Sequence, residues 1–220
     1  MKRLLVTVFV LFLSGFFILG AIQPNKLGNE DTRSGSEKLI IHNPNIKLPE
    51  FTFYKSGQVA FTNQSLKGHW SLLFIGYTFC PDVCPTTLAD LNRIYPALKN
   101  DQDTTTEVVF ISVDPNRDKA EQLADYVHYF NENFIGVTGT HEQLWPLVSE
   151  LGLIYSLVNE GETNEYYLVD HSASIVLINP TGQLHATFKS EVNEQGINHV
   201  NMDVMVEQIK KIQENYLFIH

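Results

Sequence analysis

Apolar runs of strand length alternate with amphipathic stretches along the chain, and this order constrains the fold more than any other feature. Trp70–Tyr77 and Glu107–Val113 have the length and the mostly apolar character of buried strands. A helical stretch follows each of them, the first opened by Pro85 and the second running from DPNRD to about Phe130. The alternation predicts an α/β fold in which helices flank a central mixed sheet.

Further strands and helices are expected on both sides of this region. Residues 51–54 and 59–61 are predicted to form a β-hairpin. Additional strands are expected at 166–169, 174–178 and 184–188. Amphipathic helices are predicted for the LWPLVSELGL segment and for about residues 201–215. The sequence contains no internal repeat that would favour a solenoid.

The first 22 residues have the features of a membrane anchor. Lys2 and Arg3 precede an uncharged run from Leu4 to Ile22, and about 20 apolar residues span a bilayer as a helix. We favour an uncleaved anchor over a cleaved signal sequence, because the run is long and lacks an A-x-A-like exit. The basic residues place the N-terminus in the cytoplasm. The prediction is a single-pass inner-membrane protein whose globular part faces the periplasm.

Composition divides the rest of the chain into a linker and a domain. Residues 23–45 are rich in Asn, Gly, Ser, Pro and charge without clear periodicity, which predicts a flexible tether. The globular domain is therefore expected at 46–220. The formal net charge is -10, so no basic excess exists to neutralise phosphates, and nucleic acid is not expected as a partner.

Cys80 and Cys84 are the only cysteines of the chain, and they lie four residues apart in FCPDVCP. This spacing permits a disulfide between them, and a helix starting near Pro85 would lower the pKa of a thiol there. A purely structural bridge is disfavoured, because so short a loop removes little entropy from the unfolded chain. Thiol–disulfide exchange and metal binding through two soft donors both remain open.

Metal binding requires a third ligand, and the chain has eight histidines. His171 is modestly favoured because it lies between two strand-like segments, and functional groups are common at strand ends. His69, His185 and His199 remain alternatives. An ordinary solvent-exposed side chain is the default interpretation of each of these histidines.

Four sequence blocks, in order, resemble the Sco/SenC family. They are FIGYTFCPDVCP, SVDPNRD, GVTGTHEQL and YYLVDHSASIVLINPTGQL, and they extend from Phe74 to Leu184. The resemblance implies a thioredoxin-like domain on a membrane tether that binds copper, as Cu(I) or Cu(II), through Cys80, Cys84 and His171. It also implies a role in assembling the binuclear copper centre of cytochrome c oxidase. The implied partner is the copper-centre subunit or another copper chaperone.

The family role is copper delivery, reduction of the receiving cysteines, or both, and a turnover enzyme is not expected. The main alternative is a membrane-tethered thiol–disulfide oxidoreductase, and a peroxidase of related fold is a further one. Thioredoxin-like redox motifs usually have two residues between the cysteines, whereas this chain has three. We expect Cys80 and Cys84 to form a disulfide on oxidation.

The DPNRD block has two acidic residues whose roles the sequence leaves open. Asp118 and Glu121 have capping-box spacing, so Asp118 is expected to cap the helix that follows. Asp114 ends a predicted strand near the cysteine loop, where a supporting role is plausible.

Overall fold

The structure is a computed structural model of the chain, and it describes residues 38–98, 106–158, 167–194 and 196–219. The expected membrane anchor at 1–22 and the first part of the expected tether, up to residue 37, lie outside these residues. Across the described ranges, none of the helices has the length and apolar content needed to cross a bilayer.

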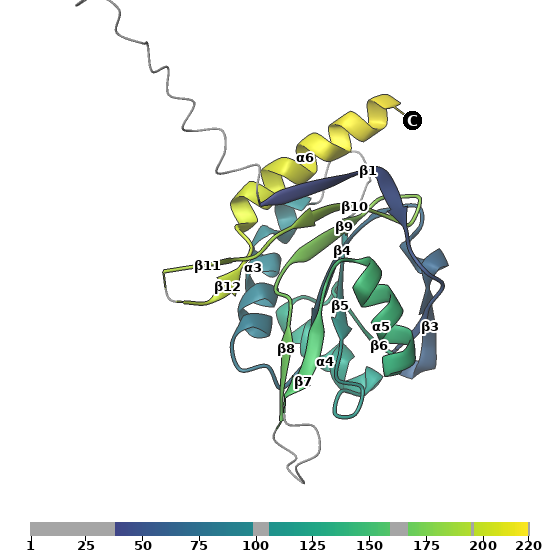
Figure 1. Cartoon of the computed structure of the whole chain (residues 1–220), viewed down its shortest axis with the longest axis vertical. Helices are drawn as coiled ribbons and strands as arrows, with labels where there is room; N and C mark the ends of the chain where they lie inside the picture. Colours follow the sequence, from purple (N-terminus) through teal and green to yellow (C-terminus); the bar gives the residue numbers. More distant parts are fainter. Residues whose placement is uncertain (1–37, 99–105, 159–166, 195, 220) are drawn as a thin grey trace, which may run out of the picture. The chain divides into compact units, whose positions relative to one another are not determined.

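An eight-stranded mixed sheet forms the centre of the domain, as the alternation of strands and helices predicted (Figure 1). The strands lie in the order β1-β10-β9-β4-β5-β6-β2-β3. Adjacent strands are parallel at β4–β5 and β5–β6 and antiparallel at the other pairs. Their bounds are β1 (Leu39–Lys47), β2 (Thr52–Lys55), β3 (Val59–Thr62), β4 (Trp70–Gly76), β5 (Thr106–Ser112), β6 (Ile135–Thr138), β9 (Ile175–Ile178) and β10 (Gln183–Phe188).

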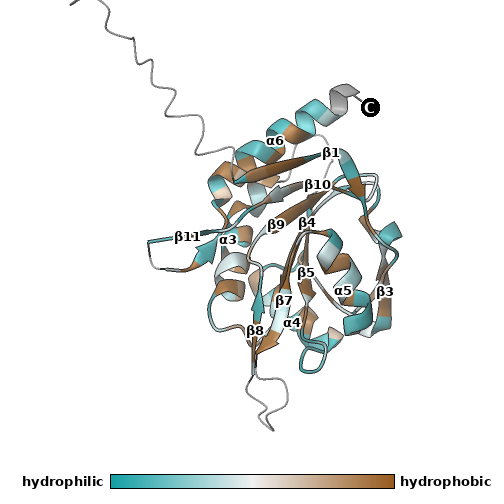
Figure 2. Cartoon of the chain, viewed as in Figure 1, coloured by the Kyte–Doolittle hydropathy of each residue, from teal (hydrophilic) through white to brown (hydrophobic). Residues whose placement is uncertain are grey.

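Helices cover both faces of this sheet, because alternate residues of a strand point to opposite sides. Leu72 and Phe74 of β4 pack with one hydrophobic cluster, which includes residues of α3, α4 and α6. Leu73 and Ile75 pack with a second cluster, which includes residues of α5. Figure 2 shows the resulting concentration of hydrophobic residues along β4, β5 and β9. The helices are α3 (Val83–Leu98), α4 (Ala120–Phe130), α5 (His141–Glu150) and α6 (Met202–Ile219).

Two short ribbons lie outside the central sheet. One consists of β7 (Tyr155–Val158) and β8 (Leu168–His171), which pair antiparallel with Tyr155 opposite His171. The other consists of β11 (Glu191–Val192) and β12 (Asn198–His199). The β7–β8 ribbon matters for function because its last residue is the favoured third ligand, His171.

The expected boundary between tether and domain is wrong at one point. The tether was predicted to run to residue 45, but β1 begins at Leu39 and pairs with β10. The strand is hard to recognise in the sequence because it lies at an edge of the sheet, where Ile40 and Ile41 are exposed. A register shift between Ile41 and Ile46 also interrupts its alternation.

The remaining strand predictions differ from the structure mainly in their limits. The predicted hairpin is confirmed as β2–β3, with a short 3-10 helix, η1 (Ser56–Gln58), in its turn. Gly57 in that turn has φ +73°, a conformation that glycine adopts without strain. The strand predicted at 166–169 is instead Leu168–His171, so His171 belongs to the strand itself.

Candidate metal centre

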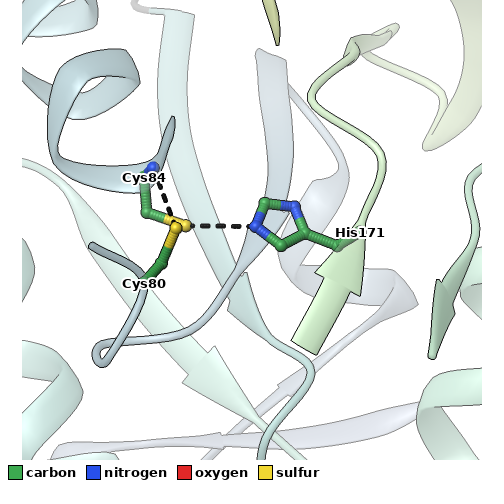
Figure 3. A group of neighbouring side chains, drawn as sticks. All are labelled: Cys80, Cys84 and His171. Atoms are coloured by element: carbon green, nitrogen blue, oxygen red, sulfur yellow. Dashed lines mark hydrogen bonds between the residues drawn. The ribbon is translucent and has the colours of Figure 1, made fainter. Parts of the chain in front are cut away.

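Cys80, Cys84 and His171 lie together at one end of the central sheet (Figure 3). Their ligand atoms all lie within 4.8 Å of one another. Within the described residues, no other set of three or more His, Cys, Asp or Glu side chains is grouped in this way. The structure therefore brings together the three side chains that the family resemblance singled out.

The cysteine pair lies where β4 leads into α3. Cys80 is in the connecting loop, and Cys84 is the second residue of the helix, close to the expected helix start. The backbone N–H of Cys84 donates to the Cys80 sulfur at 3.5 Å. A thiolate at Cys80 is thus stabilised by a backbone donor at the positive end of a helix.

The pKa values of the two thiols are shifted in opposite directions. The hydrogen bond with Cys84 is the main factor that lowers the pKa of Cys80, to about 4. Burial is the main factor that raises the pKa of Cys84 well above its ordinary value. Cys84 is fully buried and Cys80 partly buried, so the pair offers one accessible thiolate beside one protonated thiol. Both are free thiols in the structure, and the disulfide of the oxidised protein stays a prediction.

His171 turns its Nε2 atom toward the sulfurs. Its Nδ1 lies 3.0 Å from the carbonyl oxygen of Ser172. A carbonyl oxygen can only accept, so this contact assigns the hydrogen to Nδ1 and leaves the lone pair on Nε2. Nε2 lies 3.4 Å from the Cys84 sulfur. The imidazole is held in the orientation that a metal ligand requires, because its second nitrogen is anchored to the backbone.

The aromatic surroundings of His171 restrict its ring further. The ring centroids of Phe74 and Tyr77 lie 6.3 and 5.9 Å from that of His171, both in edge-on geometry. Phe74 and Tyr77 come from the end of β4 and the residue after it, directly ahead of the cysteine loop. The same strand thus supports the imidazole and leads to both sulfurs.

Gly76 allows the Cys84 sulfur to lie over the end of β4. A Cβ atom at this position would lie 2.5 Å from the Cys84 sulfur and 2.7 Å from the Phe110 ring. Both distances are far shorter than van der Waals contact. The glycine is therefore required by the close approach of the buried sulfur to the strand.

The donor set suits a soft metal ion with few ligands. Thiolate sulfur and imidazole nitrogen together favour Cu(I) or zinc over hard cations such as magnesium. Structural zinc almost always takes four protein ligands, whereas the cluster found among the described residues has three. Because the thiolates are also the reactive form for disulfide exchange, metal affinity and redox state are coupled in this site.

The other candidate histidines make different contacts. His69 pairs with Glu107 at 3.0 Å, and His199 Nδ1 lies 3.2 Å from the Glu191 carbonyl oxygen. His185 packs edge-on against the rings of Trp70 and Tyr216. The structure places none of these three alternatives in the group formed by the cysteines and His171.

Asp118 does not cap the helix as expected. Helix α4 begins at Ala120, with Lys119 at the N-cap position. The buried Asp118 carboxylate instead accepts from the Thr78 N–H at 2.9 Å, the Thr78 hydroxyl at 2.5 Å and the Ser112 hydroxyl at 2.6 Å. Burial raises the pKa of Asp118, while these hydrogen bonds act in the opposite direction. The residue fixes the chain just ahead of Cys80, because its donors lie on that segment and on β5.

Comparison with known proteins identifies the family and relatives of this domain. The SCO1/SenC family model matches residues 42–205. A SCO2-like protein of Rickettsia typhi is 31% identical over 176 residues, which cover 80% of this chain and 80% of that protein.

Solved structures of relatives include several with copper bound. ScoI of Arabidopsis thaliana superposes with a TM-score of 0.64 and 30% identity, covering 76% of this chain and 98% of that one. For ScoI of Bradyrhizobium japonicum the TM-score is 0.58 and the identity 31%, covering 64% of this chain and 88% of that one. These likenesses confirm the expected thioredoxin-like fold around the cysteine loop.

Proposed function

Because the chain belongs to the SCO1/SenC family, we propose that it binds copper through Cys80, Cys84 and His171 and serves in the assembly of cytochrome c oxidase. The proposed recipient is the subunit that carries the binuclear copper centre, or another copper chaperone. The observation that carries the proposal is the grouping of two sulfurs and an imidazole nitrogen within 4.8 Å. The copper-bound relatives support the choice of metal.

The acidities of the two thiols support an order of events for copper uptake. Cys80, partly exposed and with a lowered pKa, is the thiolate that first meets incoming Cu(I). Cys84 then binds with loss of its proton to solvent, because a metal-bound thiol is deprotonated. His171 completes the set through Nε2, since its Nδ1 is engaged with the Ser172 carbonyl oxygen. Release to a recipient would reverse this order, with recipient thiolates replacing His171 first and Cys80 last.

A second role, reduction of the recipient's cysteines, is favoured by one specific observation. Cys80 combines partial exposure with a lowered pKa, whereas Cys84 is buried next to it. The Cys80 thiolate would attack the recipient's disulfide, forming a mixed disulfide and releasing one recipient thiolate. Cys84, on losing its proton, would then attack Cys80, so that this chain is oxidised and the recipient is left with two thiols.

Residues 1–22 determine the proposed location of the protein. Their apolar run is proposed to anchor the domain in the inner membrane, with the domain in the periplasm. The full chain should sediment with membranes and resist carbonate extraction, and a chain without residues 1–22 should be soluble. Persistent membrane association of the shortened chain would count against this assignment.

The copper proposal is tested by comparing the reduced and oxidised full chain in an anaerobic Cu(I) titration against a chromophoric chelator. Thiolates are the ligands, so the reduced chain should take up one Cu(I) and the disulfide form essentially none. A Cys80→Ser/Cys84→Ser variant is the matched control, because it keeps the polar side chains and removes both sulfurs. Equal uptake by all three samples would reject the cysteine pair as the site.

A further inference from the structure

The strand that carries His171 does not pair with any strand of the central sheet. β8 pairs with β7 in a separate two-stranded ribbon, whereas the cysteine loop follows β4 at the middle of the main sheet. The relative position of the histidine and the sulfurs therefore depends on side-chain packing and on contacts between the ribbon and the cysteine loop. Arg117 and Asp114, from the segment that follows β5, make such contacts.

Arg117 binds the residue that leads into β8. Its Nη1 donates to the Tyr167 carbonyl oxygen at 2.9 Å. Its guanidinium carbon also lies 3.7 Å from the centroid of the Tyr167 ring, within the range of a cation–π contact. The arginine side chain is only 14% exposed, so these contacts are largely shielded from water.

The same guanidinium group faces the cysteine loop. It lies 4.9 Å from the ring centroid of Phe79, the residue before Cys80, and 5.6 Å from that of Tyr77. Tyr77 in turn packs edge-on against the His171 ring. Arg117 thus contacts both chain segments that bring ligands to the proposed metal site.

Asp114 accepts hydrogen bonds from both Arg117 and Tyr167. One of its carboxylate oxygens accepts from Arg117 Nε at 2.5 Å, and the other accepts from the Tyr167 hydroxyl at 2.5 Å. The carboxylate is fully buried, and a buried charge is tolerated only when it is paired and hydrogen-bonded. Tyr167 is consequently held at its carbonyl by Arg117 and at its hydroxyl by Asp114.

We infer that Arg117, oriented by Asp114, positions His171 against the cysteine pair by bracing Tyr167 and the cysteine loop. Tyr167 precedes His171 by four residues, about 13 Å of extended chain, so fixing one end of this short strand directs the other. The inference rests on the proposed three-residue copper site and adds a positioning residue to it. Arg117 itself is not a ligand.

The test is a double-mutant cycle on the full chain, read as Cu(I) affinity. Arg117→Met keeps the length and the apolar stem but removes the charge and the donors. It should weaken Cu(I) binding about tenfold or more, as loss of a residue that orients a ligand typically does. In a His171→Ala background the same change should alter affinity less than about twofold, because no histidine remains to be positioned.

Arg93→Met is the matched control, since Arg93 is an exposed arginine that also pairs with carboxylates, those of Asp90 and Asp203. It should leave Cu(I) affinity within about twofold in both backgrounds. An equal loss from Arg117→Met in both backgrounds would mean that Arg117 acts on general stability, and the inference would be overturned. Unchanged affinity in the parent background would overturn it as well.

A metal-free readout separates this inference from the copper proposal. Native-state hydrogen exchange of the reduced chain should show faster exchange of the 168–171 amides in Arg117→Met, with the β4 and β5 amides unchanged. If Arg117→Met fails to fold, Arg117→Lys is used in its place. Lysine keeps a cation beside Asp114 but cannot also make the second contact of the guanidinium group, to the Tyr167 carbonyl oxygen. If the parent and His171→Ala bind copper equally, His171 is not a ligand and the copper proposal is wrong. The exchange measurement still decides whether Arg117 holds β8 in place.

Discussion

The Asp118 carboxylate accepts hydrogen bonds from both the backbone N–H and the hydroxyl of Thr78, two residues ahead of Cys80. A third donor, the Ser112 hydroxyl, comes from β5. One buried side chain therefore ties the start of the cysteine loop to the neighbouring parallel strand. Asp118, the last residue of the DPNRD block, contacts the segment ahead of Cys80, whereas Asp114 contacts Tyr167 ahead of β8 and Arg117 contacts both segments.

Asp118→Asn should destabilise the fold, because an amide replaces one acceptor oxygen with a group that donates. The Thr78 hydroxyl would have to turn from donor to acceptor, and the remaining hydrogen bonds would lose the charge of the carboxylate. The expected loss is about 1–3 kcal/mol in the free energy of unfolding, measured by urea denaturation. Asp125→Asn, at an exposed position of α4, is the control and should change stability by less than about 0.5 kcal/mol. Equal stability of the two variants would contradict this role.

The role of Asp118 shows where local sequence patterns stop being informative. Its spacing to Glu121 fits a capping box, and nothing nearby in the sequence argues against that interpretation. Its actual donor Thr78 lies 40 residues away along the chain, and the pairing arises only when β4 and β5 align in parallel. The strands β4 and β5 could be predicted because each is a continuous apolar run. The edge strand β1 could not, because its partly exposed residues form no such run.

The grouping of Cys80, Cys84 and His171 was predictable in part. The cysteine loop and the helix start follow from FCPDVCP, because proline and the spacing act locally. The choice of His171 over His69, His185 and His199 came from the family resemblance, since His171 is 87 residues from Cys84 and only the folded ribbon brings them together. Arg117 and Tyr167 were not singled out, because their contacts depend on that ribbon. The one sequence feature that could have pointed to Arg117 was its place in the DPNRD block.

The reactivity of Cys80 should depend little on pH in the neutral range. Thiolate is the form that reacts with iodoacetamide, and a pKa of about 4 keeps Cys80 ionised well below pH 7. The alkylation rate of the full chain should therefore stay nearly constant from pH 8 to pH 6. An ordinary thiol, with a pKa of about 8.5, would slow nearly tenfold per pH unit over that range.

The comparison variant for this measurement is Cys84→Ala, which removes the hydrogen bond that lowers the pKa of Cys80 most. Its alkylation rate should fall more steeply with decreasing pH than that of the parent. If the parent itself slows tenfold between pH 7 and pH 6, Cys80 is an ordinary thiol and the proposed order of copper uptake is wrong.

Gly76→Ala should disturb the position of Cys84. The added methyl group would lie 2.5 Å from the Cys84 sulfur, so the sulfur, the strand or both must move. We expect a stability loss of about 1–3 kcal/mol, as for other overpacked cores, together with weaker Cu(I) binding. Gly136→Ala, on β6, is a matched control, because its methyl group would lie 2.9 Å from the Leu123 carbonyl oxygen of α4. It should lower stability similarly and leave Cu(I) affinity unchanged, and an equal affinity loss in both variants would contradict the assignment.

His171→Ala separates the copper site from a plain dithiol. Loss of one of three ligands should lower Cu(I) affinity by more than the roughly 10–100-fold that loss of an orienting partner costs. The cysteines are untouched, so they should still form a disulfide on oxidation. The measurement is a competitive Cu(I) titration of the reduced full chain, with circular dichroism to verify folding.

His199→Ala is the control for this last variant, because His199 contacts a backbone carbonyl in the β11–β12 ribbon and is not part of the cysteine group. It should bind Cu(I) as tightly as the parent. If folded His171→Ala also retains the parental affinity, the imidazole is not a ligand, and the two sulfurs alone must account for binding. In that case the lowered pKa of Cys80 and the burial of Cys84 would favour thiol–disulfide exchange as the main activity, because those properties do not require the histidine to bind metal.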